Sequence, residues 1–292
     1  MELTVERLIR HATPLLFGIY GHAIGEKGEI NIKVGGSGVF IAPFLAITAR
    51  HVSRELLKFD YRAERPPKGT FEAQFGSSIF QLHEPFGGKP VHAVWKVDRS
   101  WDSRFTDISL MQVSADSGLA LQFQKEMPRT FLEWRFLPPH LGGKVTLLGF
   151  PQTSITQLND EFRIDTNFIL QEAAIVDVHY PWRDRGMLNF PCYELNMPVD
   201  HGFSGGPAFF DGRLCGIVAS GTSYDNRSYI TALWPLALME YDYAGLGGKT
   251  TFRDLVDRGA IKSIDWPEIR SRIAICSDEH GEEYACLKER AG

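Results

Sequence analysis

The sequence predicts a mainly β protein with two antiparallel β sub-domains and a partly helical C-terminal segment. Short apolar or alternating runs recur between turn residues as far as about Trp234, a spacing typical of an antiparallel sandwich or barrel. The stretch 117–143, which contains Pro128, Pro138 and Pro139, interrupts this rhythm and is expected to connect the two sub-domains. Beyond Trp234 the apolar pattern favours helices.

The expected strands lie in apolar runs bounded by glycine, proline and other turn residues. In chain order these runs are PLLFGIYGHA, INIKV, GVFIA, FLAIT, VHAVWKV, DISLMQV, KVTLLGF, CYELNM, AFFDG, LCGIVAS and YITAL. The glycine-containing stretches 33–40, 85–90 and 141–145 are expected to be turns. We place the first barrel at about 13–115, the connection at about 116–141 and the second barrel at about 142–236, so that residues 1–236 form one domain.

Residues 237–292 are predicted to form a C-terminal extension. Helices are expected in WPLALMEYDY (234–243), TFRDLVDRG (251–259) and DWPEIRSRIA (265–274). The final stretch, RIAICSDEHGEEYACLKER, fits a hairpin.

The composition argues against several classes of function. Asp and Glu number 36 against 31 Lys and Arg, so the charge balance favours neither nucleic acid nor an anionic membrane as a partner. No apolar run approaches the roughly 20 residues that a membrane-spanning helix needs. No HExxH motif or paired Cys and His spacing predicts a metal, and no other cofactor is expected.

The cysteines and the N-terminal residues indicate the cellular compartment in which the protein is expected. Charged residues stand where an export signal would have its apolar core, and the four cysteines contain no CxxC pair. We therefore expect a cytoplasmic protein with free thiols. A bridge between Cys276 and Cys286, across the terminal hairpin, is the alternative.

The stretch VDHGFSGGPAFF (199–210) places Ser204 between Gly202 and the pair Gly205 and Gly206. Glycines cluster where a turn needs a positive φ or where another group must come close to the backbone. A plain turn between strands is one explanation. The other is a nucleophilic serine, which needs a base for its proton and N–H donors for the oxyanion. A tight turn would offer the N–H groups of Gly202 and Ser204 as those donors.

Two further candidates stand at the ends of apolar strands. His51 follows the run VFIAPFLAITAR, and Asp107 directly precedes ISLMQV. Taken singly, each has an ordinary structural explanation, as a packed histidine or as an acid at a strand edge. Together with Ser204 they occur in the order His, Asp, Ser, which makes them candidates for one catalytic site.

The motifs GSGVFIAPFLAITARHV, TDISLMQV and GFSGGPAFF together resemble those of the trypsin/chymotrypsin-like serine peptidases, especially the bacterial trypsin-like, HtrA-type branch. LGGKVTLLGFP resembles the start of that family's second barrel, and LCGIVASGTS resembles its cleft-lining strand. The resemblance covers about residues 13–236. It implies a chymotrypsin-like double six-stranded antiparallel β-barrel and a serine endopeptidase that cleaves protein or peptide substrates through an acyl-enzyme intermediate.

The resemblance also implies a role for each residue. His51 would act as the general base, Asp107 would orient its ring, and Ser204 would attack the scissile carbonyl. The N–H groups of Gly202 and Ser204 would form the oxyanion hole. Asp98 and Asp102 are alternatives for the acid, although neither leads directly into an apolar strand.

By the same resemblance, the substrate-binding residues would be Pro198 and Val199 at the base of the specificity pocket and Ala219, Ser220 and Gly221 along its wall. Pro198 stands where members that cut after Arg or Lys carry an acid. A small or medium apolar residue is therefore expected before the cut. Asp200 is the alternative determinant, since a loop shift would turn its charge inward.

Phe203 departs from the family pattern. Secreted members carry an aspartate there, which pairs with the N-terminal amine that activation cleavage releases, and phenylalanine cannot form that pair. We expect Phe203 to pack under the turn as an apolar anchor, without zymogen activation.

The sequence leaves two alternatives to a free-standing peptidase. One is a catalytically inactive trypsin-fold scaffold that binds a partner protein. The other is a regulated protease subunit of a multi-component stress or defence system, in which a regulatory protein partner would act through residues 237–292.

Overall fold

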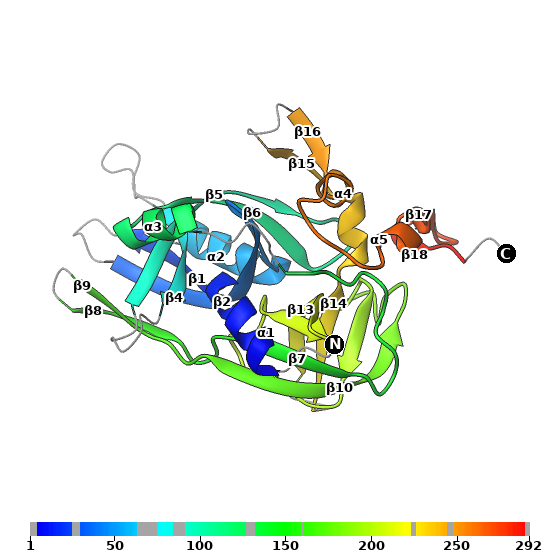
Figure 1. The fold of residues 1–292 in the computed structure, drawn as a ribbon, viewed down its shortest axis with the longest axis horizontal. Helices are drawn as coiled ribbons and strands as arrows, with labels where there is room; N and C mark the ends of the chain where they lie inside the picture. Colours follow the sequence, from blue (N-terminus) through cyan, green and yellow to red (C-terminus); the bar gives the residue numbers. More distant parts are fainter. Residues whose placement is uncertain are drawn as a thin grey trace.

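The structure is a computed structural model, and it describes residues 5–24, 30–62, 75–83, 91–126, 132–158, 161–222, 226–243 and 248–289. The turn expected at 85–90 lies outside these residues. Within them the chain forms two closed six-stranded barrels, which confirms the predicted double-barrel fold class. In Figure 1 the first barrel, blue to cyan, lies above the second, green to yellow. None of the described helices is long and apolar enough to cross a membrane.

The first barrel is preceded by α1 (Val5–Ala12) and η1 (Thr13–Leu15) and is followed by α3 (Gly118–Glu126). Its strands are β1 (Leu16–Ile24), β2 (Ile30–Ala42), β3 (Leu45–Ala49), β4 (Phe75–His83), β5 (Val91–Asp102) and β6 (Ile108–Ala115), with α2 (Arg50–Arg62) after β3. They pair in the order β1-β2-β3-β6-β5-β4, and β4 closes the barrel on β1. The fully buried ring of Phe40 lies 5.2 Å from Phe17 and 5.1 Å from Trp95 between centroids, so aromatic side chains fill the centre.

The second barrel pairs in the order β10-β11-β14-β13-β12-β7, and β7 closes it by pairing with both β10 and β12. Its strands are β7 (Lys144–Gly149), β10 (Ile169–His179), β11 (Cys192–Leu195), β12 (Pro207–Phe210), β13 (Arg213–Thr222) and β14 (Arg227–Ala232). A separate hairpin of β8 (Ser154–Leu158) and β9 (Glu161–Asp165) connects β7 to β10.

The prediction of a turn at 33–40 is wrong, because these residues belong to β2. The pairing of β2 with β1 shifts at Gly35, which has no partner in the register and forms a bulge. A Cβ on Gly36 would lie 2.4 Å from the carbonyl oxygen of Ser204, and one on Gly38 would lie 2.3 Å from the ring of Phe17. These two glycines therefore allow close packing within and between the barrels rather than a chain reversal.

The C-terminal segment contains η2 (Trp234–Leu238), β15 (Glu240–Tyr243), β16 (Gly248–Thr251), α4 (Phe252–Asp257), α5 (Trp266–Ile269), β17 (Ile273–Ser277) and β18 (Glu283–Leu287). The prediction of a helix over 234–243 is wrong beyond Leu238, because residues 240–243 form β15, which pairs with β16. Tyr241 is buried between exposed Glu240 and Asp242, which is the two-residue period of a strand. The helix predicted over 265–274 ends at Ile269, whereas the predicted terminal hairpin is confirmed as β17 and β18.

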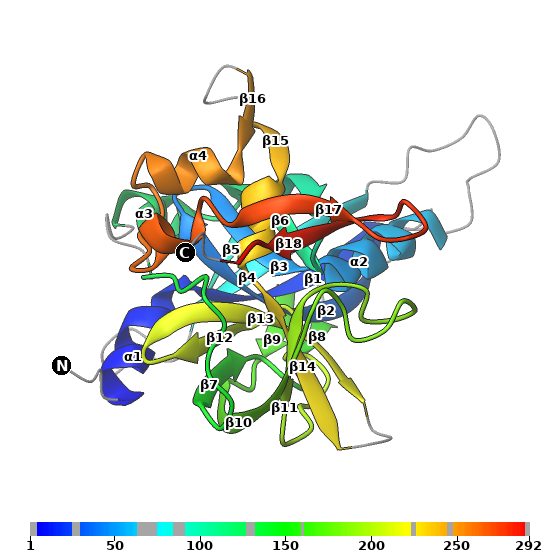
Figure 2. The same cartoon turned by 90° about the vertical axis from the view of Figure 1, so that its right-hand side faces the viewer.

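The C-terminal segment packs on the connection between the barrels. Its Phe252 lies 5.4 Å from Trp134 between ring centroids, and its Trp266 lies 5.2 Å from Phe136. The carboxylate of Asp265 accepts the backbone N–H groups of Phe136 and Leu137. Figure 2 shows the orange and red elements covering one side of the barrels. This segment thus shares the main hydrophobic core.

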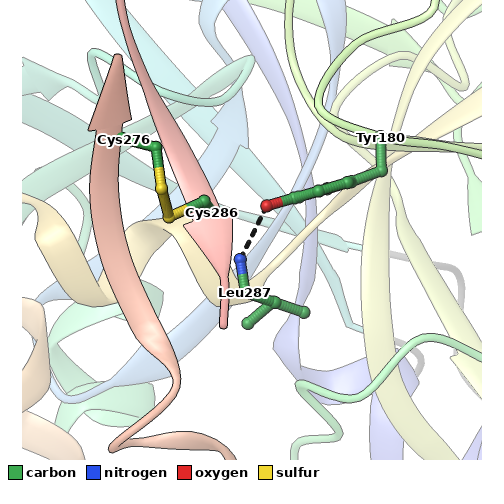
Figure 3. The surroundings of a disulfide bond; sticks show 4 residues. All are labelled: Tyr180, Cys276, Cys286 and Leu287. Atoms are coloured by element: carbon green, nitrogen blue, oxygen red, sulfur yellow. Dashed lines mark hydrogen bonds between the residues drawn. A yellow bond between two sulfur atoms is a disulfide. The ribbon is translucent and has the colours of Figure 1, made fainter. Parts of the chain in front are cut away.

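The terminal hairpin carries a disulfide. Cys276 on β17 and Cys286 on β18 are bonded, with their Cα atoms 5.8 Å apart (Figure 3). The expectation of free thiols is therefore wrong for this pair, because the hairpin register places the two side chains on neighbouring strands. The backbone N–H of Leu287 donates to the hydroxyl of Tyr180 at 2.8 Å, which ties the hairpin to the second barrel.

Candidate active site

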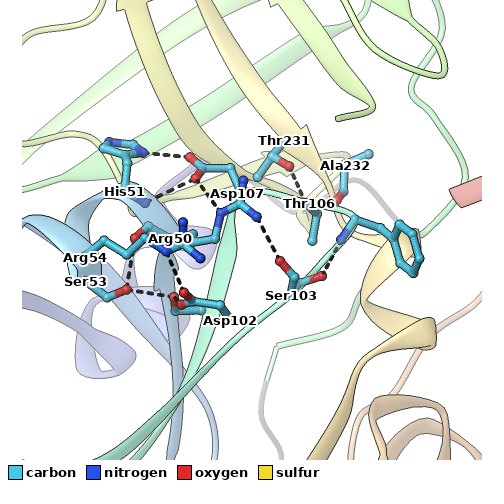
Figure 4. Close-up of polar contacts among 12 residues, drawn as sticks. Arg50, His51, Ser53, Arg54, Asp102, Ser103, Thr106, Asp107, Thr231 and Ala232 are labelled. Atoms are coloured by element: carbon cyan, nitrogen blue, oxygen red, sulfur yellow. Dashed lines mark hydrogen bonds and ion pairs between the residues drawn. The ribbon is translucent and has the colours of Figure 1, made fainter. Parts of the chain in front are cut away.

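The pairing of β3 with β6 brings His51 and Asp107 together. Ala49, at the end of β3, pairs with Ile108, at the start of β6, so the residues just beyond these positions are neighbours. His51 Nδ1 lies 2.7 Å from Asp107 Oδ2, and the backbone N–H of His51 donates to Asp107 Oδ1 at 3.2 Å (Figure 4). One carboxylate thus contacts both the ring and the backbone of the histidine.

Asp107 is buried, with 5% of its surface exposed. Its Oδ1 lies 3.8 Å from Nε of Arg50, and its carbonyl oxygen accepts the backbone N–H of Arg50 at 3.0 Å. The guanidinium of Arg50 also donates to the carbonyl of Ser103. The contacts with Arg50 and His51 compensate the burial of the carboxylate charge.

The two alternative acids have other partners. Asp102 Oδ2 accepts from Nε of Arg54 at 2.7 Å, and its Oδ1 accepts from the hydroxyl of Ser109. Asp98 accepts from the hydroxyl of Ser114 at 3.0 Å. Among the described residues, neither carboxylate bonds to His51, so the geometry favours Asp107.

Ser204 stands directly after a tight turn formed by residues 200–203. The N–H of Phe203 donates to the carbonyl of Asp200 at 3.2 Å, and Gly202, the third residue, has a φ of 99°, as a type II turn requires. A Cβ on Gly202 would lie 2.8 Å from Cα of Pro151, so the neighbouring loop also demands glycine. Phe203 is fully buried, which confirms the expectation that it packs under the turn.

The next peptide groups continue this compact loop. The N–H of Gly206 donates to the carbonyl of Phe203 at 2.7 Å, and the N–H of Gly205 donates to the carbonyl of Val218 at 2.8 Å. Within the described part of the chain, the N–H groups of Gly202 and Ser204 have no protein acceptor. They are free to donate to a ligand.

His51 and Ser204 line one cleft with a volume of about 1010 Å³. The hydroxyl of Ser204 donates to the carbonyl of Ala219 at 3.4 Å, and among the described contacts it has no hydrogen bond to His51. A long hydroxyl contact of this kind leaves the side chain able to turn toward the imidazole.

The cleft also brings together part of the predicted specificity pocket. Pro198, Val199 and Ala219 line it, as does the alternative determinant Asp200. Ser220 and Gly221 follow Ala219 in β13, but how far they are buried lies outside what the structure describes.

Sequence reasoning missed other lining residues, among them Glu55, Gln152 and His201. Glu55 lies one turn after His51 on α2, and this i, i+4 spacing was the available signal. Gln152 has a φ of 55°, a conformation that its sequence context does not reveal.

The free cysteines Cys192 and Cys215 are unsuited to nucleophilic chemistry. Both are buried, and burial raises the pKa of each thiol to about 12. Because the thiolate is the reactive form, neither competes with Ser204 as a nucleophile near neutral pH.

In the described part of the chain, one cluster has the composition of a metal site, namely Asp177, His179 and Glu194. Its groups already have protein partners, since Glu194 pairs with His179 at 2.9 Å and with Arg227 at 3.3 Å. The cluster is separate from the residues that line the cleft.

Comparison with known proteins identifies the family of this chain. A family model described as a trypsin-like peptidase domain matches residues 36–217. No curated protein gave a significant match. Among solved structures, the active form of the Rv3671c protease from M. tuberculosis aligns with a TM-score of 0.48 and 17% identity over 84% of this chain and 86% of that chain. The Ser343Ala mutant of Rv3671c from M. tuberculosis H37Rv, in an inactive form, gives a TM-score of 0.47 and 18% identity over 80% and 89% of the two chains.

Proposed function

Because the chain belongs to the trypsin-like peptidase family, we propose that it is a serine endopeptidase that uses His51, Asp107 and Ser204 as its triad. One observation carries the proposal. A histidine that is hydrogen-bonded to a buried carboxylate shares a cleft with a serine whose loop offers two free N–H groups. This combination of base, orienting acid, nucleophile and donors is what acyl transfer requires.

The proposed reaction begins with attack by Ser204 Oγ on the scissile carbonyl carbon. His51 Nε2 takes the hydroxyl proton, while Nδ1–H stays bonded to Asp107 Oδ2. The protonated imidazole then gives its proton to the leaving amine, and an ester to Ser204 is left. Water, deprotonated by the same imidazole, hydrolyses this acyl-enzyme and regenerates the serine. Before attack the hydroxyl must exchange its 3.4 Å contact with Ala219 for one with His51, an adjustment that apo geometry commonly needs.

The developing oxyanion would be bound by the N–H groups of Gly202 and Ser204. The type II turn directs the N–H of Gly202, because the alternative type I turn would flip the peptide between His201 and Gly202. Such donors act in the transition state more than in the ground state, so they raise kcat.

For specificity we propose cleavage after small or medium apolar residues. Pro198, Val199 and Ala219 bring no charge to the cleft, and the charge there closest to them in the chain is that of Asp200, which is exposed. A peptide library tests this proposal, and dominant cleavage after Arg or Lys would shift the assignment to Asp200.

The scaffold alternative has one observation in its favour, namely that the hydroxyl of Ser204 bonds to Ala219 and not to His51. In the other alternative, the regulated protease subunit, a partner that binds residues 237–292 would bring the Ser204 hydroxyl into contact with His51.

The cytoplasmic location stays a prediction, and the disulfide between Cys276 and Cys286 argues against it, since disulfides persist mainly in oxidising compartments.

Hydrolysis of a fluorogenic peptide library or of unfolded casein by the wild-type chain and by Ser204→Ala tests the proposal. We expect turnover by the wild-type chain and loss of turnover in the variant, with the fold retained in both. Turnover that survives Ser204→Ala would refute the assignment. A well-folded wild-type chain that shows no turnover on either substrate would favour the scaffold.

A further inference from the structure

We propose that Ser37 is a positioning residue that holds the oxyanion hole in shape, an inference that rests on the proposed peptidase function. Ser37 lies in β2 of the first barrel, whereas the turn around Ser204 belongs to the second barrel. It is 1% exposed and does not line the cleft, so it cannot touch substrate. Its effect on the reaction must act through the residues that it contacts.

Every polar group of Ser37 forms a hydrogen bond. Its hydroxyl donates to the carbonyl of Gly202 at 2.6 Å and accepts the N–H of Phe150 at 2.9 Å. Its backbone N–H donates to the carbonyl of Ser204 at 2.8 Å, and its carbonyl accepts the hydroxyl of Thr48 at 2.7 Å. Thr48 belongs to β3, the strand that precedes His51, so Ser37 joins this strand to the turn that precedes Ser204.

These bonds fix two peptide groups at both ends. Between Gly202 and Phe203, the carbonyl is held by the Ser37 hydroxyl and the N–H by the carbonyl of Asp200. After Ser204, the carbonyl is held by the Ser37 N–H, and the following N–H, of Gly205, donates to Val218. The Ser204 donor therefore has a fixed peptide on each side, and the Gly202 donor has one on its C-terminal side, so neither donor can turn freely unless these bonds break.

The packing around the Ser37 carbonyl and hydroxyl leaves little space for a water molecule. A Cβ on Gly205 would lie 2.1 Å from the carbonyl oxygen of Ser37, and a Cβ on Gly149 would lie 3.2 Å from its hydroxyl oxygen. The cavity left by one missing oxygen atom is smaller than a water molecule needs. In Ser37→Ala, the carbonyl of Gly202 and the N–H of Phe150 would both lose a buried partner, and the turn could regain hydrogen bonds only by rotating.

The effect should fall on the chemical step. Deleting one oxyanion donor outright lowers kcat by about 10²–10³-fold, so loosening a donor in Ser37→Ala should lower kcat by about 10–100-fold. KM should change by less than about threefold, because the interaction is made in the transition state. Ser37→Thr keeps the hydroxyl and should restore most of kcat.

Steady-state kinetics of the full chain on one peptide ester, with melting temperatures, provide the test. The matched control is Ser117→Ala, which removes a hydroxyl that accepts the N–H groups of Val94 and Ala120, outside the cleft. The control should lower the melting temperature without lowering kcat. A drop in kcat for Ser37→Ala that Ser37→Thr repairs supports the proposal.

Two results would overturn it. One is a Ser37→Ala enzyme with wild-type kcat, and the other is a loss of activity that Ser117→Ala reproduces at the same melting temperature. Hydrolysis by the wild-type chain and its loss in Ser204→Ala are measured alongside, so a failure of the proposed function is seen separately. A wild-type chain without Ser204-dependent hydrolysis would overturn both.

Discussion

The contact between His51 and Asp107 fixes which imidazole nitrogen carries the proton. With a carboxylate 2.7 Å from Nδ1, the favoured tautomer has its hydrogen there and leaves Nε2 free to accept. Asp107→Asn would offer the ring an amide in place of the carboxylate and favour the wrong tautomer. We expect kcat to fall on the order of 10⁴-fold, with the fold retained, as measured by peptide hydrolysis and circular dichroism.

Asp102→Asn is the matched control, because Asp102 is also an acid near α2 but pairs with Arg54 and Ser109. We expect it to affect stability more than kcat. If Asp102→Asn abolishes activity while Asp107→Asn preserves it, the acid has been assigned to the wrong residue.

Phe203 fills the space beneath the turn that precedes Ser204. It is fully buried, and a Cβ on Gly149 would lie 2.9 Å from its ring, so the pocket beneath the turn is filled. Phe203→Asp should reduce hydrolysis strongly, since a buried carboxylate without a partner costs several kcal/mol or forces the turn open. Titration of active sites with a serine-reactive phosphonate gives the measurement, and Phe203→Leu is the control. An aspartate variant with full activity would contradict an apolar anchor.

At the scale of elements, α4 is held by a capping box at its first turn. The N–H and hydroxyl of Thr251 and the hydroxyl of Thr250 donate to the carboxylate of Asp254, and these bonds lower the pKa of Asp254. A pKa that is lower in the folded state gives stability that is present above the unfolded value, about 3.9 for aspartate, and is lost as pH falls below it. Wild type should therefore be more stable than Asp254→Asn at pH 7, and the difference should shrink below about pH 4. Thermal melts of both chains across this range measure it, and a pH-independent difference would contradict the linkage.

The hairpin of β17 and β18 is closed by its disulfide. Replacing both cysteines, Cys276→Ser with Cys286→Ser, should lower the free energy of unfolding by roughly 2–3 kcal/mol, because the bridge closes a short loop in the unfolded chain. Denaturant unfolding with and without a dithiol reductant measures the effect. Wild type and variant should converge when the reductant is present. Equal stability without reductant would show that the hairpin does not contribute to the cooperative unit.

The sequence predicted strands well where apolar residues alternate in the barrels and poorly where the strands carry small or polar residues. Strand β4 reads FGSSIFQLH and β10 reads ILQEAAIVDVH, and neither was expected, because serine, glutamine and glutamate dilute their apolar signal. The glycines of β2 have the local pattern of a turn, but they lie in a strand because groups from distant parts of the chain approach them closely. A local sequence pattern does not reveal tertiary contacts of this kind.

At the scale of the whole molecule, the site depends on both barrels. His51 and Asp107 come from the first barrel, the loop around Ser204 comes from the second, and Ser37 bonds directly across the junction. The sequence predicted the three candidate residues because each lies in or beside a short motif. The contact of Asp107 with His51, and the part played by Ser37, required the strand pairing and the packing of the two barrels. The C-terminal segment adds its own aromatic residues to the same core.

The central claim is that Ser204 is a nucleophile activated by His51. Labelling of the native chain with a fluorophosphonate probe, followed by peptide mapping by mass spectrometry, tests it most directly. We expect one adduct, located on Ser204, which is absent in Ser204→Ala, absent after denaturation and strongly slowed in His51→Ala. Labelling of a different residue, or an unlabelled Ser204 in correctly folded protein, would contradict this account.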